Sequence, residues 1–316
     1  ESKEDMQVLL DYTHKWCENW KMKINMSKSK AMHFRKQATE RCDTIFKLGN
    51  AEVKYVEKYM YLGVFFDEFL TFEDHGVTMT KSGGIALGAI IAKYKKLDNM
   101  GFDTFNRLYE SSICPVINYG SEVLGYMKKQ KSDCIQTKAM KIFLGVHRFA
   151  CNEAVEGDMG WYPNHLRRTL NVLRYWNRMI KLENDRLTKK VFNYEYSLKK
   201  KGTWCDFVKS TLSNLGLWQL YCNLQACDLK LCKERLYVDV WSNCIRKKPK
   251  LRTFIQLKQD FKTEKYVSMN LERNQRSLLA QLRTGTLPLH LETGRFENKK
   301  VEERTCKICG TNNVET

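Results

Sequence analysis

The spacing of its apolar residues restricts the fold of this chain more than any other feature. From about residue 73 onward, apolar residues recur every three or four positions in long stretches, which is the period of an amphipathic helix. Before that point only residues 2–20 follow the helical period, and the apolar runs that come next are short and typical of strands. The sequence therefore predicts a mainly helical α+β fold with a small antiparallel sheet in the first 70 residues.

The first 70 residues are expected to form one helix and several short strands. In the helix, residues 2–20, Ser2 and Asp5 have capping-box spacing, and one face is apolar. That face holds Met6, Leu9, Tyr12, Trp16 and Trp20. Strands are expected at 21–25, 31–34, 44–56 and 59–67, the third being a hairpin that turns at Gly49-Asn50.

Helices are expected over most of the remaining chain. They are predicted at 78–97, 103–127, 131–146 and 161–192, with more helical pattern within 203–243. Pro115 is expected to break the second of these helices. Gly83, Gly84 and Gly88 lower the helix propensity of the first, but such small residues allow helices to pack closely.

The chain is strongly basic, with 54 Lys and Arg against 36 Asp and Glu and a formal net charge of +18. An excess this large indicates a polyanionic partner, and nucleic acid is the most common one. A membrane-surface protein is the alternative, but the chain has no lysine-rich amphipathic terminus and no lipidation signal. Solubility alone needs a much smaller charge.

Two segments concentrate the basic residues. In residues 246–283 eleven basic residues are interleaved with Phe254, Phe261 and Tyr266, a composition that suits a phosphate backbone and stacked bases. In the predicted helix 161–192, basic residues recur on one face at helical spacing, and nucleic-acid contact and a solvated basic face both stay open for them. The second interpretation is preferred for this helix taken alone. The basic residues of that face are Arg167, Arg174, Arg178 and Lys181.

Cysteine content and hydropathy indicate an intracellular protein, in the nucleus, the cytoplasm or both. Twelve cysteines are scattered along the chain, which favours reduced, mostly buried thiols over a disulfide framework. No apolar run reaches the roughly 18 residues needed to cross a bilayer. No secretory signal is present at the start, although a fragment could have lost one.

The sequence contains no recognisable catalytic motif. Motifs for zinc proteases, nucleophile elbows, P-loops and dinucleotide sites are all missing. Two-metal phosphoryl transfer needs carboxylates that converge on ions about 4 Å apart, and no adjacent acid pair comes with a second carboxylate-bearing strand. The pair Asp67-Glu68 is expected to end a hairpin. The residues by themselves therefore predict nucleic-acid binding without a catalytic centre.

Cys306, Cys309 and Gly310 form a short knuckle near the end of the chain. A zinc half-site is the preferred interpretation, because glycine permits the tight turn that places two thiolates on one ion. A redox pair and a chance spacing are the alternatives, and the flanking residues lack the strand and helix that a thioredoxin-like pair requires. His290 is a weak candidate for a third zinc ligand.

Several ordered motifs resemble LINE-type (non-LTR retrotransposon) reverse transcriptases. Residues 9–34 resemble the stretch after the family's catalytic Tyr-Ala-Asp-Asp signature, at positions Asn25, Lys28, Ser29, Lys30, Met32 and Phe34. Segments resembling the next strand, the thumb and the C-terminal region follow in the same order, so the resemblance covers nearly the whole chain. These segments are 59–67, 111–126, 139–146, 282–296 and 303–310.

The resemblance implies roles for a few residues. Lys28 and Lys30 would border the incoming nucleotide and the template, with surface lysines on a loop as the alternative. Tyr61 and Gly63 would lie on the primer-grip strand, whose Leu62 is expected to pack in the core. The family's Mg²⁺-binding aspartates would precede Glu1, so this chain alone is expected to be inactive. The His and Cys that complete a Zn²⁺ site would follow Thr316.

These observations predict four parts and one leading function. The parts are the end of a reverse-transcriptase palm (1–70), a helical thumb-like domain (71–150), a basic helical region (151–300) and the start of a zinc knuckle (301–316). The leading function is a fragment of an RNA-directed DNA polymerase that binds an RNA and DNA template–primer duplex. A non-catalytic RNA- or DNA-binding protein, degenerate or domesticated, is the main alternative, and a helical scaffold without nucleic acid is the third.

Overall fold

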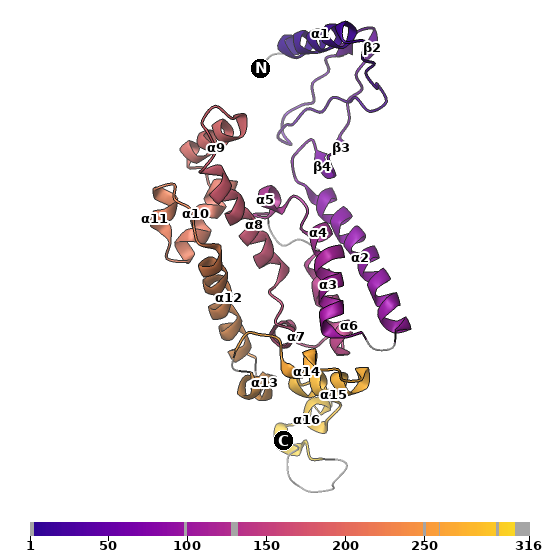
Figure 1. The fold of residues 1–316 in the computed structure, drawn as a ribbon, viewed down its shortest axis with the longest axis vertical. Coiled ribbons are helices and arrows are strands. Elements are labelled where there is room, and N and C mark those ends of the chain that lie inside the picture. The colour runs from indigo at the N-terminus through magenta and orange to yellow at the C-terminus, as the bar shows by residue number, and fades with distance from the viewer. Residues whose placement is uncertain are drawn as a thin grey trace. The chain divides into compact units, whose positions relative to one another are not determined.

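A computed structural model of the chain describes residues 3–97, 100–127, 132–248, 251–258, 260–294 and 297–306. The chain is mainly helical and has two two-stranded antiparallel sheets within its first 70 residues, which confirms the predicted fold class (Figure 1). Its contacts divide it into two compact units: unit 1 is Glu1–Thr78 and unit 2 is Met79–Thr316. The predicted four-part division stays a prediction.

Unit 1 consists of one helix, two hairpins and the first turn of α2. Its elements are α1 (Lys3–Asn19), β1 (Lys47–Leu48), β2 (Ala51–Glu52), β3 (Lys58–Tyr61), β4 (Val64–Asp67) and the start of α2 (Glu73–Lys96). β1 pairs with β2 around Gly49-Asn50, as predicted, and Gly49 has a φ of +62°. The strands predicted at 21–25 and 31–34 do not form; Ala31 makes a single bridge to Tyr55.

The single strand predicted at 59–67 is wrong, because this segment forms the β3–β4 hairpin. Leu62 and Gly63 both have positive φ values, +48° and +80°, and therefore reverse the chain between Tyr61 and Val64. Leu62 is 74% exposed at the tip, so its expected packing in the core is also wrong. A turn residue at the end of a two-stranded ribbon has no second layer to pack against.

The predicted helix 2–20 is confirmed as α1, with Ser2 outside the described residues. Gln7 fixes it to the first hairpin, because its amide donates to the Lys47 carbonyl at 2.9 Å and accepts from the Lys47 N–H at 3.0 Å. The small core of unit 1 consists of Ala31, Phe46, Leu48 and Val53, with Leu10 packed against it. The apolar face of α1, including Tyr12 and Trp16, is exposed within this chain.

Unit 2 is helical throughout its described residues. Besides most of α2, its elements are α3 (Phe102–Ser112), α4 (Cys114–Ile117), α5 (Ser121–Leu124), α6 (Asp133–Leu144), α7 (Asn152–Met159), α8 (Asn164–Met179), α9 (Leu187–Leu198), α10 (Trp204–Asn214), α11 (Trp218–Cys222), α12 (Leu229–Arg246), α13 (Arg252–Leu257), α14 (Lys265–Ser268), α15 (Arg273–Arg283), α16 (His290–Thr293) and the 3₁₀ turn η2 (Val301–Glu303). The predicted break near Pro115 is confirmed, since α3 ends just before α4.

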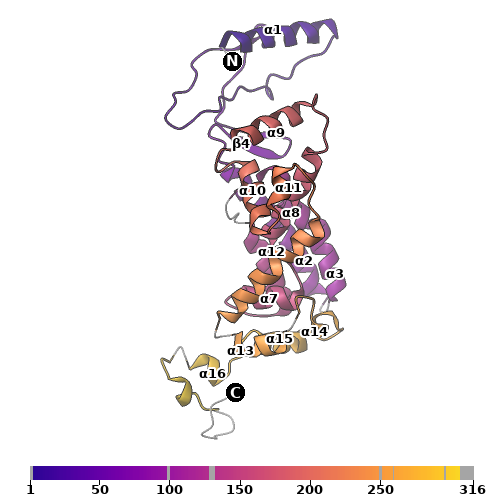
Figure 2. The same cartoon turned by 90° about the vertical axis from the view of Figure 1, so that its left-hand side faces the viewer.

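Three apolar clusters form the core of unit 2. The first joins α2, α3, α6 and α15 around Tyr94, Phe105 and Phe143. The second lies around Trp176 and joins the five helices α8, α9, α10, α11 and α12. The third joins α7, α12 and α13 around Trp241 and Phe254. Helices α8 and α12 lie side by side in both views of this unit (Figures 1 and 2).

The helix predicted over 161–192 is wrong in one respect, because the segment forms two helices, α8 and α9. The chain leaves helical geometry between Met179 and Leu187. Lys189, in the first turn of α9, donates to the Met179 carbonyl at 2.9 Å and to the Ile180 carbonyl at 3.2 Å. Its ammonium thus caps carbonyls at the C-terminal end of α8.

Candidate nucleic-acid interface

A tight turn presents Lys28 at the surface of unit 1. The Asn25 side-chain oxygen accepts from the Ser27 N–H at 3.0 Å, and the Asn25 carbonyl accepts from the N–H groups of Lys28 and Ser29, both at 3.1 Å. The Ser29 hydroxyl also donates to that carbonyl. Asn25 and Ser29 therefore build the turn, Lys28 is exposed, and Lys30 is half-buried.

A hydrogen bond joins this turn to the second hairpin. The Tyr59 hydroxyl, on β3, donates to the Lys28 carbonyl at 2.6 Å. The structure thus brings together two segments that sequence reasoning singled out separately, the lysine turn and the Tyr61–Gly63 hairpin tip. Tyr61 is 60% exposed at that tip. Sequence reasoning missed Tyr59, whose only signal was an aromatic residue at a strand position two places before Tyr61.

Two acids at the base of the hairpin have structural partners. Asp67 accepts hydrogen bonds from the N–H groups of Phe69, Thr71 and Phe72. Burial opposes ionisation of Asp67, but the hydrogen bonds from Thr71 and Phe72 outweigh it and lower the pKa of this carboxyl. Glu68 binds Arg35 at 3.1 Å and Arg41 at 2.9 Å. The predicted hairpin end at Asp67-Glu68 is confirmed.

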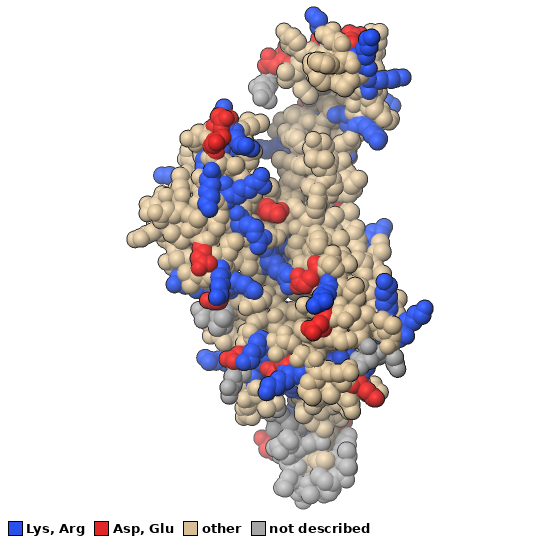
Figure 3. Space-filling view, in the orientation of Figure 1, with Lys and Arg blue, Asp and Glu red and all other residues tan. Residues whose placement is uncertain are grey.

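The three arginines predicted on α8 differ in their surroundings. Arg167 is half-buried, and its guanidinium donates to the Glu110 carboxylate on α3 at 2.8 Å. Arg174 and Arg178 are exposed, and Arg174 donates to the side chain of Asn171. Figure 3 shows Lys and Arg atoms gathered over the region that Figure 1 draws as α8. Arg174 and Arg178 can therefore reach a phosphate, whereas Arg167 is held by its acid partner.

Arg168 is a fourth arginine of α8, and its role was not predicted. It is buried, and its two guanidinium nitrogens bind the two oxygens of Asp133 at 2.7 and 2.9 Å. This bidentate pair joins α8 to α6. Arg168 lies four residues before the buried Val172 and thus on the buried face of α8, a position that its residue type alone does not predict.

The basic and aromatic segment 246–283 does not form the stacking surface that its composition suggested. Phe254 is fully buried, and Phe261 packs against the ring of Trp241. The Tyr266 hydroxyl donates to Asp158 on α7 at 2.7 Å. These rings pack between helices α7, α12 and α15 and do not form an exposed platform for bases.

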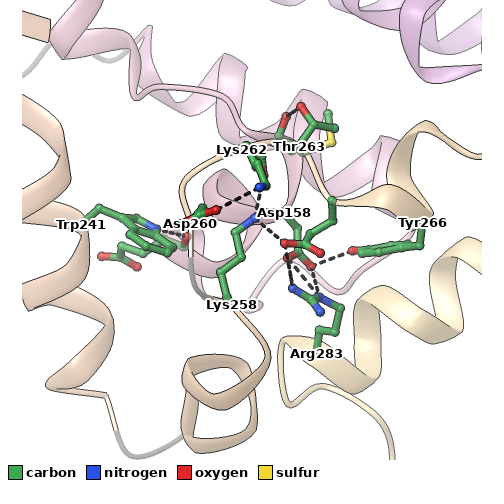
Figure 4. A network of polar contacts seen from close by, with 11 residues as sticks. Asp158, Trp241, Lys258, Asp260, Lys262, Thr263, Tyr266 and Arg283 are labelled. Atoms are coloured by element: carbon green, nitrogen blue, oxygen red, sulfur yellow. Dashed lines mark hydrogen bonds and ion pairs between the residues drawn. The ribbon is translucent and has the colours of Figure 1, made fainter. Parts of the chain in front are cut away.

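Several cations of the same segment enter an internal network around Asp158 (Figure 4). Arg283 donates to both oxygens of Asp158 at 2.8 to 3.1 Å. The buried Lys258 binds Glu264 and donates to the Lys262 carbonyl at 2.6 Å. These interactions connect α7 to the chain from α13 to α15, so the cations stabilise the fold.

The predicted zinc knuckle is described only in part. Cys306 is half-buried, and Cys309 lies outside the described residues. The Nδ1 atom of His290 lies 2.7 Å from the Thr305 carbonyl, and its Nε2 atom lies 3.5 Å from Glu297. Both ring nitrogens of His290 are therefore engaged, which does not favour it as a zinc ligand.

No group of three or more His, Cys, Asp or Glu among the described residues is placed to hold a metal ion. The described residues therefore do not fit a pair of Mg²⁺ ions of the kind that two-metal phosphoryl transfer uses. A search of the same residues also found no helix with the length and apolar character needed to cross a bilayer.

Comparison with known proteins identifies one informative relative. Over 157 residues the chain is 24% identical to an RNA-directed DNA polymerase from the mobile element jockey of Drosophila melanogaster. The match covers 49% of this chain and 17% of that polymerase. No family model and no solved structure matches the chain. About half of the chain is thus distantly related to the RNA-directed DNA polymerase of a mobile element.

Proposed function

We propose that this chain is part of the RNA-directed DNA polymerase of a LINE-type retrotransposon and that it holds the template–primer duplex. The similarity to the jockey polymerase is the observation that carries the proposal. A net charge of +18 agrees with it, because a protein that neutralises many phosphates needs an excess of cations. Such a protein would work inside the cell, in the nucleus, the cytoplasm or both.

In unit 1, the proposed contacts come from the lysine turn and the hairpin tip. Lys28 is exposed and has no acidic partner among the described residues, so its ammonium can bind a phosphate. Lys30 follows on the same turn. The backbone at Gly63 and the ring of Tyr61 would contact the primer end, since both lie at an exposed tip fixed by the Tyr59 hydrogen bond.

In unit 2, Arg174 and Arg178 are the proposed backbone contacts. They lie on one face of α8 one helical turn apart, a spacing that can follow a phosphate chain. Neither has an acidic partner within the part of the chain that is described. Arg167 is now expected to act on stability instead, because Glu110 occupies its guanidinium.

Polymerisation itself would need carboxylates for Mg²⁺ beyond those that the described residues bring together. We therefore expect the 316 residues alone to incorporate no nucleotide in a primer-extension assay. Clear extension of a DNA primer on an RNA template would contradict this part of the proposal and leave the binding part standing.

Binding of a 20-base-pair RNA–DNA hybrid at several salt concentrations tests the main proposal. The logarithm of the association constant should fall linearly as the logarithm of the salt concentration rises. The double substitution Arg174→Gln and Arg178→Gln should make that negative slope shallower by roughly 1 to 2, because each lost phosphate contact accounts for about 0.9.

Arg167→Gln is the matched control on the same helix. It should leave the salt slope unchanged and lower the melting temperature, since it removes the partner of Glu110. Absence of hybrid binding by the wild-type chain, or binding that does not depend on salt, would refute the proposed function.

A further inference from the structure

A pocket of about 470 Å³ lies between α9, α10 and α11, in a part of unit 2 to which no role has been given. Its lining combines aromatic rings with lysines from three neighbouring segments. The residues that matter for its chemistry are Tyr196, Lys199, Lys200, Lys209, Trp218 and Tyr221. Its volume falls within the range of small-molecule sites, about 300 to 1,000 Å³.

The aromatic wall of the pocket is held in place from behind. The ring of Trp218 stacks on Tyr221 with centroids 5.8 Å apart, and Tyr221 stacks on the fully buried Trp176 at 5.4 Å. The Tyr196 hydroxyl donates to the Tyr221 carbonyl at 3.1 Å. Trp218 nevertheless remains 42% exposed, so a fixed indole ring is available to a ligand.

The lysines of the pocket have no acidic partner among the described residues. Lys199 and Lys200 follow the end of α9 and are exposed, and the Lys209 ammonium lies 5.3 Å from the Trp218 ring centroid. Two acids line the same pocket, but backbone N–H groups occupy them. Glu195 accepts from the Cys205 N–H at 3.0 Å, and Asp206 accepts from the Gly202 N–H at 2.9 Å.

This combination selects for a ligand that is flat and aromatic at one end and anionic at the other. A nucleotide has that chemistry, because every base offers a π-face and every phosphate a negative charge. A base in a duplex is stacked on its neighbours and cannot enter, whereas a single strand can turn a base out. A free phosphate would use the lysines and leave the tryptophan unused.

We propose that the pocket between α9, α10 and α11 binds one unstacked nucleotide of a single strand, with the base against Trp218 and the phosphate against Lys199, Lys200 and Lys209. This inference rests on the proposed function, since it assumes that the chain binds nucleic acid. It adds a site for single strands that is separate from the duplex contacts proposed on α8 and in unit 1.

The test compares single strands with duplexes in the full 316-residue chain. Binding of dT₁₂, rU₁₂ and a 12-base-pair duplex is measured for the wild type, for Trp218→Ala and for the triple substitution Lys199→Gln, Lys200→Gln and Lys209→Gln. Trp218→Ala should weaken single-strand binding about tenfold, the usual effect of losing one base–aromatic stack, and leave duplex binding unchanged. In the triple variant, the negative slope of single-strand affinity against salt concentration should be shallower by about 2.

Tyr194→Ala and Lys190→Gln are matched controls, because both residues are exposed on α9 but do not line the pocket. Both should bind single strands as the wild type does. Trp218→Phe keeps a ring in the pocket and should retain most of the affinity, which separates stacking from misfolding. The two single strands decide between DNA and RNA as the better ligand.

A second readout needs no variant. Cys222 is exposed and lines the pocket, whereas Cys134 is exposed on α6. Bound dT₁₂ should slow alkylation of Cys222 by iodoacetamide several-fold and leave the rate at Cys134 unchanged. Inorganic phosphate at the same concentration should protect neither thiol.

The outcomes separate the two proposals. If the chain binds single strands and duplexes but the pocket variants match the wild type and Cys222 is unprotected, the pocket proposal is wrong and the proposed function stands. Equal loss of single-strand and duplex binding in the triple variant would also overturn the pocket proposal, because such a loss would indicate a general phosphate-binding surface. If the chain binds no nucleic acid at all, both proposals fail.

Discussion

Among single residues, Glu156 on α7 is a carboxyl group whose ionisation is strongly opposed by its surroundings. Burial raises the pKa of its carboxyl to about 8, and the nearby Glu153 adds to the effect. The Tyr237 hydroxyl is buried close to these acids and has no hydrogen-bond partner in the described structure. The folded protein therefore holds a proton on Glu156 at pH values at which the unfolded chain has released it.

This gives the sign of a pH effect on stability. Between the ordinary glutamate pKa of about 4.5 and about 8, the folded state binds more protons than the unfolded state, so the free energy of unfolding falls as pH rises. Glu156→Gln should remove that dependence and raise the melting temperature at pH 8. Melting curves at half-unit steps from pH 5 to pH 8.5 measure it.

Glu153→Gln on the same helix is the control. Burial opposes ionisation of Glu153, but Cys151 and the Lys248 ammonium, 2.6 Å away, outweigh it and lower its pKa. Its substitution should lower the melting temperature at neutral pH, the opposite effect. A Glu156→Gln protein with the wild-type pH dependence would show that this carboxyl is not the titrating group.

Among the helices, α2 tests how closely glycine lets two helices approach. A Cβ atom on Gly83 would lie 2.4 Å from a methyl carbon of Ile117 on α4. A Cβ atom on Gly88, further along α2, would meet nothing within 4 Å. Both glycines lie in α2, so their substitutions by alanine differ mainly in the space around the added methyl group.

Gly83→Ala should destabilise unit 2 by about 1 to 3 kcal/mol, because the added methyl forces Ile117 and its neighbours apart. Gly88→Ala should stabilise it by about 0.5 to 1 kcal/mol, since alanine favours the helix and costs no space. Urea unfolding followed by circular dichroism measures both. If Gly83→Ala left the free energy of unfolding unchanged, α4 would have to move aside at no cost.

At the same scale, the sequence predicted which segments are helical better than where they end. The period of apolar residues located α1, α2, α3 and α6, because each helix carries its apolar residues on one face. It did not locate the interruption between α8 and α9, where Lys189 reaches back to carbonyls nine and ten residues earlier. It also took the β3–β4 hairpin for one strand, since Leu-Gly is a weaker turn signal than Asn-Gly.

At the scale of the whole chain, the zinc knuckle remains a proposal that involves residues past Thr316. Zinc needs four ligands, and Cys306 with Cys309 would supply two of them. A longer protein that continues past Thr316 should hold about one zinc ion, and Cys306→Ser should remove it. Cys134→Ser is the control, because Cys134 lies on α6. Equal zinc content in all three proteins, measured by mass spectrometry, would refute the site.

The sequence by itself determined the helical character, the place of the sheets and the strong positive charge. It could do so because apolar period and net charge are properties of the chain that folding does not alter. Only the tertiary structure decided which cations face solvent. Arg168 and Arg283 are held by the carboxylates of Asp133 and Asp158, while Arg174 and Arg178 on α8 stay exposed. Pairing depends on acids that lie 35 to 125 residues away along the chain, which no local pattern reports.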